Sequence, residues 1–398
     1  MEYRDQLKQS DADYLVNCYS RFDVVIETGK NATCYDFNGK EYIDFSSGIG
    51  VNSLGYCDEG WVNAVTQQAK KLQHCSNLYY TEPGVKAAKL LCEKTGYSKV
   101  FFANSGAEAN ECAIKAARKY SYDKYGEGRN EIITLNNSFH GRTVTTLTAT
   151  GQDHFHQYFF PFTGGFTYTN PTLEETLAAI SPKTCAVLVE LIQGEGGVIP
   201  LEMEYVKTIY KVCQENDILF MVDEVQTGAG RTGKLFCFEH YGIIPDVVTS
   251  AKGIGGGLPI GVVLFHHKTQ SVLGYGDHGT TFGGNPLATA AMTEVLNRLD
   301  DALLTDVLQK GEYLKNKLEA LPLIKSVTGK GLMLGAELDG VPAAEVVKEG
   351  IQQGVIVLTA KSKLRFLPPL TITMPELNQG LDCLEKALIK IQSNSTPK

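Results

Sequence analysis

The sequence predicts an α/β protein whose large domain is built around a mostly parallel sheet. Between residues 59 and 300, short runs of β-branched and other apolar residues alternate with segments of helical periodicity. Continuous apolar runs of this length are typical of strands that helices cover on both faces. The six runs lie at 99–103, 131–135, 185–190, 218–223, 246–250 and 261–265.

The two end segments of the chain do not begin with this alternation of apolar strands and helices. Residues 1–58 begin with a polar helical stretch, and residues 301–398 begin with a long charged helix. We expect these two segments to form one smaller α+β domain beside a large domain at 59–300. The N-terminal strands are predicted at 21–27, 32–37 and 41–45, with a hairpin turn at Asn38-Gly39. The C-terminal elements are predicted as strands at 331–338 and 355–359, a helix at 343–353 and a final helix from Pro375.

The composition argues against several classes of protein. Of the 398 residues, 37 are Lys or Arg and 45 are Asp or Glu, so the formal net charge of −8 disfavours binding to nucleic acid or anionic membranes. The longest uncharged stretch, 154–173, is broken by Pro and Gly, and we expect neither a membrane span nor a signal peptide. Ten cysteines without a Cys-x-x-Cys pair indicate reduced residues and no metal site, as in a cytoplasmic protein.

The segment Asn104-Ser-Gly-Ala-Glu-Ala-Asn110 follows the first predicted strand of the large domain and opens a helix. The backbone N–H groups of Ser105, Gly106 and Ala107 would then lie at the positive end of the helix dipole, beside a serine hydroxyl. Such a helix start can bind a phosphate group. An ordinary serine N-cap is the alternative interpretation of the same residues.

Two further candidates follow strands at the edge where open α/β sheets bind ligands. Asp223 ends the strand at 218–222, where a buried carboxylate needs a cation or an N–H donor, and Gln226 could reach a hydroxyl beside that partner. Lys252 follows the strand at 246–250, and loss of water there favours a neutral amine that can form an imine with an aldehyde. A structural aspartate cap and a solvated surface lysine are the alternatives.

A phosphate site, a strand-end acid and a strand-end lysine are together what pyridoxal 5′-phosphate requires. A competing motif, Gly228-Ala-Gly-Arg-Thr-Gly233, fits the G-x-G-x-x-G pattern of dinucleotide-binding proteins such as NAD-dependent oxidoreductases. Its context differs from theirs, because no clear helix opens at Gly233 and Lys252 stands where a ribose-binding acid is expected. We therefore interpret these glycines as a loop.

Through a series of ordered motifs, the sequence resembles the class III (subgroup II) aminotransferases, a fold-type I family that uses pyridoxal phosphate. The resemblance covers nearly the whole chain. Its motifs are Asn-Ser-Gly-Ala-Glu-Ala-Asn at 104–110, Ser-Phe-His-Gly-Arg at 138–142, Glu-Leu-Ile-Gln-Gly-Glu-Gly-Gly at 190–197, Asp-Glu-Val-Gln-Thr-Gly-x-Gly-Arg-Thr-Gly at 223–233, Ser-Ala-Lys-Gly-Ile-Gly-Gly-Gly-Leu-Pro at 250–259, Gly-Thr-Thr-Phe-Gly-Gly-Asn-Pro at 279–286 and Leu-Arg-Phe-Leu-Pro-Pro at 364–369.

This resemblance implies roles for the residues that bind the cofactor. Lys252 matches the lysine that forms the Schiff base, and Asp223 matches the partner of the ring nitrogen. Thr281 matches a threonine that reaches the phosphate in the other subunit, which implies a homodimer. The remaining implied cofactor-binding residues are Ser105, Gly106 and Ala107 at the phosphate, Phe139 stacked on the ring, and Glu224, Val225 and Gln226, with Gln226 beside the ring hydroxyl.

The resemblance also implies a ping-pong transamination between N-acetylornithine and 2-oxoglutarate, as in arginine biosynthesis. Arg142 matches the arginine for the donor's carboxylate, and Arg365 matches the arginine for the α-carboxylate of glutamate. Glu195 matches an acid that pairs with Arg365 and releases it, and Thr280 lies beside the substrate. Gly48 stands where ornithine aminotransferases carry a tyrosine, which favours an N-acylated donor. Succinylornithine, N-succinyl-diaminopimelate, ornithine and 4-aminobutyrate stay open as donors.

One segment departs from the family's pattern. After Leu54-Gly55 the family usually has His-x-His-Pro, whereas this chain has Tyr56-Cys-Asp-Glu-Gly60. Because the segment lies at the entry to a helix, we expect it to change the packing or the capping there.

Overall fold

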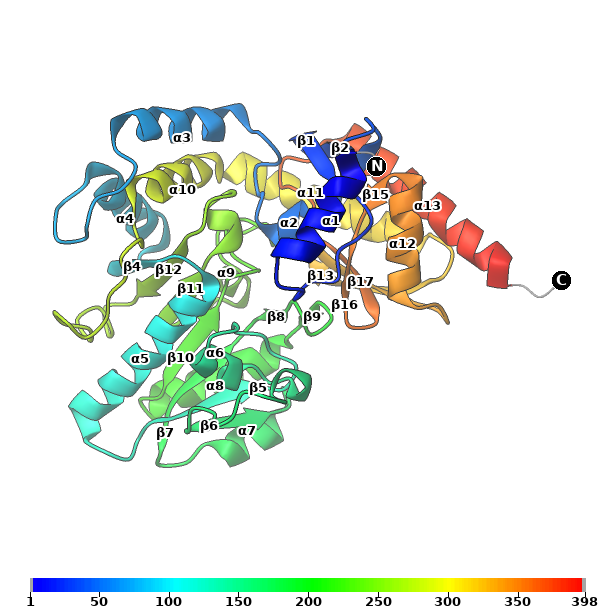
Figure 1. Ribbon diagram of the computed structural model, residues 1–398. Coiled ribbons are helices and arrows are strands. Elements are labelled where there is room, and N and C mark those ends of the chain that lie inside the picture. The colour runs from blue at the N-terminus through cyan, green and yellow to red at the C-terminus, as the bar shows by residue number, and fades with distance from the viewer. Residues whose placement is uncertain (1–2, 396–398) are drawn as a thin grey trace.

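The computed structural model describes residues 3–395 and contains a seven-stranded, mostly parallel sheet (Figure 1). Only β12 runs antiparallel to its neighbours. All six predicted strands of the large domain are present, and the edge strand β6 was not predicted. In spatial order the strands are β4 (Lys99–Ala103), β12 (Gly261–Phe265), β11 (Val247–Ser250), β10 (Leu219–Asp223), β7 (Thr184–Val189), β5 (Glu131–Leu135) and β6 (Phe166–Thr169).

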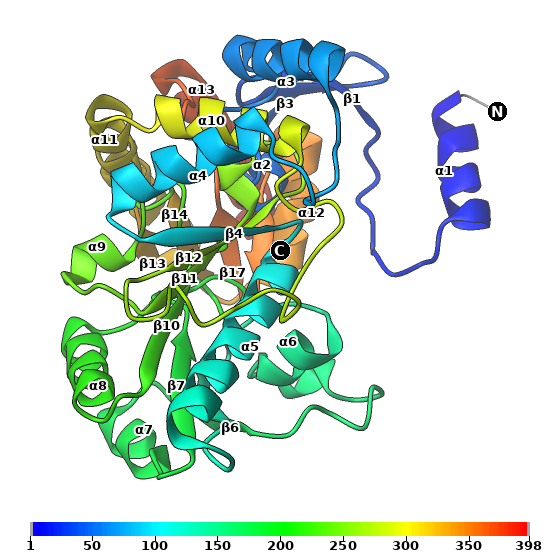
Figure 2. The ribbon, with the colours of Figure 1, turned by 90° about the vertical axis from the view of Figure 1, so that its left-hand side faces the viewer.

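Helices cover both faces of this sheet, as the continuous apolar strands predict. On one face, Ala186, Leu219 and Met221 pack in the same apolar cluster as the small residues of α5 (Gly106–Tyr125). On the other face, Val187 and Phe220 belong to the larger core cluster, to which α8 (Met203–Glu215) contributes. Figure 2 shows α5 passing in front of the sheet. The other helices around the sheet are α3 (Glu59–Lys71), α4 (Glu82–Thr95), α6 (Val144–Ala149), α7 (Leu173–Ala179), α9 (Phe238–Tyr241) and α10 (Pro286–Arg298).

The two chain ends meet in a second sheet of four strands, β1-β2-β3-β15. Its parallel pair joins β3 to β15, with Ile43 opposite Val355, so a strand from each end of the chain completes it. A third sheet has the order β13-β14-β17-β16, and β8 pairs with β9 in a short ribbon. The strands are β1 (Ile26–Lys30), β2 (Thr33–Asp36), β3 (Glu41–Asp44), β8 (Ile192–Gln193), β9 (Ile199–Pro200), β13 (Ile324–Lys330), β14 (Met333–Leu338), β15 (Val355–Ile356), β16 (Leu358–Ala360) and β17 (Lys363–Phe366).

Several elements near the chain ends differ from the prediction. The first strand begins at Ile26 rather than at 21, and the strand predicted at 355–359 is divided between β15 and β16. β13 and β17 were not predicted, because β13 mixes Lys, Ser and Gly with apolar residues and β17 buries Arg365. The helices at this end are α1 (Tyr3–Tyr14), which lies apart from the body in Figure 2, α2 (Ser47–Gly50), α11 (Asp301–Glu319), α12 (Ala343–Gln353) and α13 (Met374–Ser395).

Two general expectations can be compared with the structure. All ten cysteines are free thiols, and five of them are buried, which agrees with reduced core residues. Within residues 3–395, no helix combines the length and the apolar character that crossing a bilayer demands.

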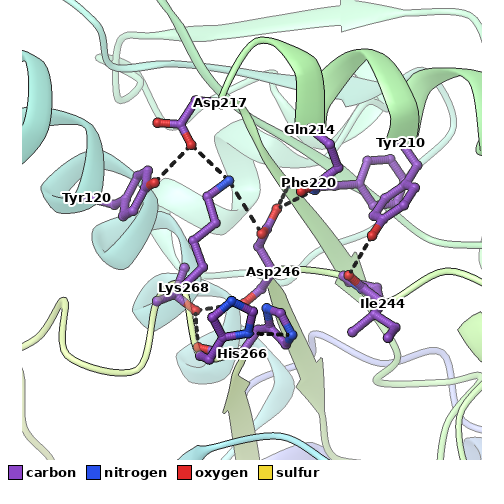
Figure 3. Close-up of polar contacts among 12 residues, drawn as sticks. Tyr120, Tyr210, Gln214, Asp217, Phe220, Ile244, Asp246, His266 and Lys268 are labelled. Atoms are coloured by element: carbon purple, nitrogen blue, oxygen red, sulfur yellow. Dashed lines mark hydrogen bonds and ion pairs between the residues drawn. The ribbon is translucent and has the colours of Figure 1, made fainter.

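A network of charges joins strands at the amino end of the sheet (Figure 3). Lys268 Nζ lies 3.0 Å from Asp217 Oδ1 and 3.6 Å from Asp246 Oδ1, so it bridges the segments that lead into β10 and β11. Asp217 also accepts hydrogen bonds from Lys124 and Tyr120, at 2.6 and 2.9 Å. Burial would raise the pKa of Asp217, but its hydrogen bonds to these cations and hydroxyls reverse the effect and hold the pKa below 3.8.

Replacement of Lys268 with Met is expected to lower the free energy of unfolding at pH 7 by about 1–3 kcal/mol, because both carboxylates lose a charged partner. A carboxylate with a depressed pKa contributes stability above its unfolded pKa and loses it as the pH falls through the folded value. The difference in the free energy of unfolding between wild type and K268M should therefore be largest at neutral pH and should become smaller below pH 3.8. Urea unfolding at several pH values measures both effects.

Lys211→Met is the matched control, because Lys211 makes only an exposed pair with Glu215 at 3.8 Å. If K268M and K211M unfolded at the same urea concentration at pH 7, the ion pairs of Lys268 with Asp217 and Asp246 would not stabilise the protein.

Candidate active site

A cavity of about 480 Å³ opens at the carboxyl edge of the large sheet. The ends of parallel strands meet at this edge, so residues that are distant in sequence come together there. The predicted site residues that line the cavity are Ser105, Gly106, Ala107, Phe139, Arg142, Asp223, Val225, Gln226 and Lys252.

One end of the cavity is the start of α5. Ser105 is its N-cap in an extended conformation, and Ser105 Oγ accepts a hydrogen bond of 3.2 Å from the N–H of Glu108. The first N–H groups of an α-helix have no partner within the helix, so those of Gly106 and Ala107 can bind an anion. A Cβ at Gly106 would lie 2.7 Å from Val225 Cγ1, so only glycine lets the helix start approach the loop after β10 this closely.

Asp223 is held by donors from two other segments and by one from the loop that follows it. Its Oδ2 accepts hydrogen bonds from Asn110 Nδ2 at 2.7 Å and His140 Nδ1 at 2.8 Å, and Oδ1 accepts one from the N–H of Val225 at 3.0 Å. Thr249 in turn donates to Asn110 Oδ1 at 2.7 Å. These donors satisfy both oxygens of a carboxylate that is only 3% exposed.

Asn110 and His140 are site residues that the sequence motifs did not identify. Asn110 lies four residues after Gly106 on α5, and therefore on the same face of the helix. That spacing is the signal that would have placed it beside the loop after β10. His140 Nε2 is buried without a hydrogen-bond partner among the described residues, and His140 lines the cavity.

Lys252 follows β11 and lies next to Asp223 because β10 and β11 pair in parallel, with Asp223 opposite Thr249. Its backbone is left-handed, with φ of 48°, and its side chain lines the cavity. Burial lowers the pKa of the Lys252 amine, which favours the neutral form, although the carboxylates of Glu195 and Asp223 act in the opposite direction. A neutral amine at this position is both a nucleophile and a proton acceptor.

Arg365 and Glu195 form an ion pair beside the cavity. Arg365 Nη1 lies 2.5 Å from Glu195 Oε1 and 3.3 Å from Gln226 Oε1. The Arg365 side chain is 4% exposed, whereas that of Glu195 is 30% exposed. Burial alone would raise the pKa of Glu195, but the guanidinium of Arg365 reverses the effect and lowers it.

Arg142 lines the cavity and is an exposed residue. Its Cζ is 4.0 Å from the ring centroid of Phe155 and 5.5 Å from that of Phe139, so it rests on two aromatic faces. Among the described residues, no carboxylate lies within ion-pair distance of Arg142. The N–H of Phe139 donates to the buried Glu190 at 2.8 Å, a contact that the sequence analysis did not foresee.

Other predicted site residues lie away from the cavity wall. Glu224 points into the core, where burial raises its pKa to about 7 and it accepts hydrogen bonds from Thr227 and the N–H of Phe238. Thr280 Oγ1 accepts a hydrogen bond of 3.0 Å from Asn104 Nδ2, and Thr281 is exposed. Gly48 belongs to the left-handed turn α2, next to the cavity residue Val51.

The glycines of the competing G-x-G-x-x-G motif form a packed loop. No helix opens at Gly233, and the next one, α9, begins at Phe238. A Cβ at Gly228 would lie 2.7 Å from the carbonyl oxygen of Glu224, and one at Gly233 would lie within the side chain of Leu308. The loop therefore lacks the helix start that binds a dinucleotide's pyrophosphate.

Comparisons with known proteins agree with this geometry. The chain is 50% identical to acetylornithine aminotransferase from Haemophilus ducreyi over 390 residues, which cover 96% of this chain and 98% of that protein. It is 44% identical to succinylornithine transaminase from Photorhabdus laumondii, with 95% and 96% covered. A crystal structure of ornithine aminotransferase from Toxoplasma gondii, which has partial occupancy of PLP at its active site, matches with a TM-score of 0.93 at 32% identity, covering 98% of this chain and 95% of that one.

The family model for class-III aminotransferases matches residues 15–388, which is nearly the whole chain. The seven-stranded sheet and the smaller sheets agree with the fold-type I architecture of that family. The chain therefore belongs to the class-III aminotransferases.

Proposed function

We propose that the protein is a pyridoxal-phosphate-dependent aminotransferase that converts N-acetylornithine and 2-oxoglutarate to N-acetylglutamate 5-semialdehyde and glutamate, a step of arginine biosynthesis. One observation carries the proposal. Lys252, the hydrogen-bonded Asp223 and the start of α5 all line the same cavity. Identity of 50% to acetylornithine aminotransferase from Haemophilus ducreyi supports the choice of donor.

The residues fit the cofactor's functional groups. The glycine at 106 leaves open the helix start where a phosphate would bind, and Asp223 presents a carboxylate for a protonated ring nitrogen. The amine of Lys252 would hold the aldehyde, and Phe139 offers an aromatic face at the cavity wall. When bound, this cofactor acts as an electron sink for the substrate carbon that loses a proton.

The protein's own groups would then move the proton and orient the substrate. Lys252, whose pKa is lowered by burial, can accept a proton and return it at a neighbouring carbon. Asn110 and His140 would hold the carboxylate of Asp223 in a fixed orientation. The cavity walls restrict access of water to these groups, which strengthens their electrostatic interactions.

Arg142 is free to bind a carboxylate, whereas Arg365 is paired with Glu195. This difference suits two substrates that carry their carboxylates at different distances from the reacting carbon. The guanidinium of Arg142 can take a carboxylate of N-acetylornithine in its bidentate fork. Arg365 is covered by Glu195 while the donor presents its side-chain amine. The partly exposed Glu195 could turn toward solvent, which would release Arg365 for the α-carboxylate of 2-oxoglutarate or glutamate.

Other acylated donors are the second candidates. The 44% identity to succinylornithine transaminase favours N-succinylornithine among them. N-succinyl-diaminopimelate shares the N-acylated, carboxylate-bearing end, but the carbon of its free amine carries a second carboxylate, whereas ornithine and 4-aminobutyrate lack the acyl group. Competition between these amines in the same assay ranks them directly.

We further propose that the protein is a homodimer in which Thr281 reaches the phosphate site of the partner subunit. Thr281 lies in an exposed loop together with Phe282, whose side chain is 61% exposed. Tyr80 and Tyr275 are also almost fully exposed. Large exposed aromatic side chains favour an interface between protein chains where they lie together.

Lys252→Ala is expected to abolish turnover of N-acetylornithine, because no other lysine among the described residues lines the cavity, where it could hold the cofactor and carry the proton. A coupled assay for glutamate measures the loss. Lys207→Ala, which removes an exposed lysine from α8, is the control and should retain full activity. Parent-like turnover by K252A would contradict the assignment of Lys252.

Gly48→Tyr is expected to lower kcat/KM for N-acetylornithine relative to ornithine by about tenfold or more, because the ring occupies the space of the acyl group. Gly48 has φ of 64°, so any side chain there adds backbone strain of about 1–2 kcal/mol. Gly48→Ala carries the same strain without the ring and is the matched control. If the ratio of kcat/KM for N-acetylornithine to kcat/KM for ornithine were equal in Gly48→Tyr and Gly48→Ala, the argument for acyl selectivity would be wrong.

Sedimentation of the purified protein is expected to give twice the chain mass of 43.5 kDa. Phe282→Asp should shift the mass toward that of a single chain, because a charge is buried at the proposed interface. Ile389→Asp, on the exposed side of α13, is the control and should leave the mass unchanged. A wild-type protein that sediments as a single chain would contradict the dimer.

A further inference from the structure

The backbone after Lys252 is held by side chains from the N-terminal part of the chain. Trp61, the only tryptophan of the sequence, lies on α3, and its indole Nε1 donates a hydrogen bond of 3.0 Å to the carbonyl oxygen of Gly255. Ser53 Oγ donates a hydrogen bond of 2.6 Å to the carbonyl oxygen of Gly253. Two carbonyl groups within three residues of Lys252 thus accept hydrogen bonds from outside the loop.

The indole ring also packs directly on this loop. A Cβ at Gly256 would lie 2.9 Å from Trp61 Nε1, and one at Gly257 would lie 3.3 Å from Trp61 Cζ2. The glycines at these positions therefore allow the ring to approach the backbone closely. Since Gly257 and Leu258 line the cavity, the ring of Trp61 forms a support directly behind the cavity wall.

The turn needs such support because Lys252 has a left-handed backbone. Its φ of 48° is unfavourable for a residue with a side chain, and such conformations persist only where the surroundings enforce them. Inside the turn, the N–H of Gly255 donates to the carbonyl oxygen of Lys252 at 3.0 Å. The turn at Lys252–Ile254 is short and has few hydrogen bonds of its own. The hydrogen bonds from Ser53 and Trp61 hold its backbone from outside.

Trp61 is itself fixed by the segment that departs from the family pattern. Asp58 caps α3 by accepting a hydrogen bond of 3.0 Å from the N–H of Trp61. The same carboxylate forms an ion pair of 3.0 Å with Arg298 at the end of α10. The helix entry at 56–60 therefore fixes where the indole meets the loop after Lys252.

We propose that Ser53 and Trp61 are positioning residues that hold the carbonyl groups of Gly253 and Gly255 and thereby aim Lys252 into the cavity. This inference rests on the proposed function of Lys252 and extends it to residues that do not touch the substrate. Neither residue contacts Arg142 or Arg365, so binding of the substrate carboxylates does not depend on them.

Trp61→Phe and Ser53→Ala remove the two hydrogen bonds separately, and Trp61→Phe keeps an aromatic ring on the loop. Each variant is expected to lower kcat about tenfold while KM for N-acetylornithine and 2-oxoglutarate stays within about twofold, because the misplacement affects proton transfer and not carboxylate binding. The control is Val62→Ala, which truncates an exposed side chain on the same helix.

A second readout requires neither cofactor nor turnover. Without cofactor, amide hydrogens of residues 251–259 are expected to exchange about fivefold faster in Trp61→Phe and Ser53→Ala than in wild type, the factor expected when one hydrogen bond is lost. Amide hydrogens of β13 and β14 should exchange at wild-type rates in all variants. Peptide mass spectrometry after deuterium labelling measures both.

The outcomes separate this inference from the proposed function. Wild-type kcat and wild-type exchange at 251–259 in both variants would overturn the positioning role, whatever the activity of the parent. An increase in KM as large as the fall in kcat, or equally fast exchange throughout the protein, would indicate a merely structural role and would also overturn it. A wild-type protein that forms no visible band with pyridoxal phosphate would instead contradict the proposed function.

Discussion

The site depends first on the parallel register of β10 and β11. Pairing of Asp223 with Thr249 places the carboxylate and the segment that leads to Lys252 side by side at the carboxyl edge of the sheet. Thr249 also donates a hydrogen bond to Asn110, which donates one to Asp223. These hydrogen bonds of the site therefore depend on the register of the two strands. A slip of one residue would turn Asp223 to the other face of the sheet and separate it from α5.

Near this pair, two arginines differ in burial and in the partners that they contact. Arg365 is buried and paired with Glu195, whereas Arg142 is exposed and rests on the rings of Phe139 and Phe155. One cation is therefore neutralised within the protein and the other is open to an incoming carboxylate. In the proposed reaction, this asymmetry lets one cavity accept a donor through its side-chain amine and an acceptor through its α-carboxylate.

The sequence predicts the large sheet well because its strands are buried on both faces and read as continuous apolar runs. It does not predict β17, because Arg365 interrupts the apolar pattern of a buried strand. In the site, motifs locate Asp223 and Lys252, since Asp223 ends a recognisable strand and Lys252 comes two residues after another. The partners Asn110, His140 and Glu190 come from separate segments, and only the folded chain shows which atoms they approach. The support from Trp61 is unpredictable for the same reason, since it depends on where α3 meets the loop after Lys252.

The most direct test of the proposed chemistry is the visible absorption spectrum of the protein after reconstitution with pyridoxal phosphate. Addition of N-acetylornithine alone should bleach the band of the lysine-bound cofactor, and later addition of 2-oxoglutarate should restore it, because each substrate completes one half of the reaction. A band that N-acetylornithine leaves unchanged and another amine bleaches would contradict the assigned donor. The absence of any band after reconstitution would contradict the role of Lys252 and Asp223 on which the whole interpretation rests.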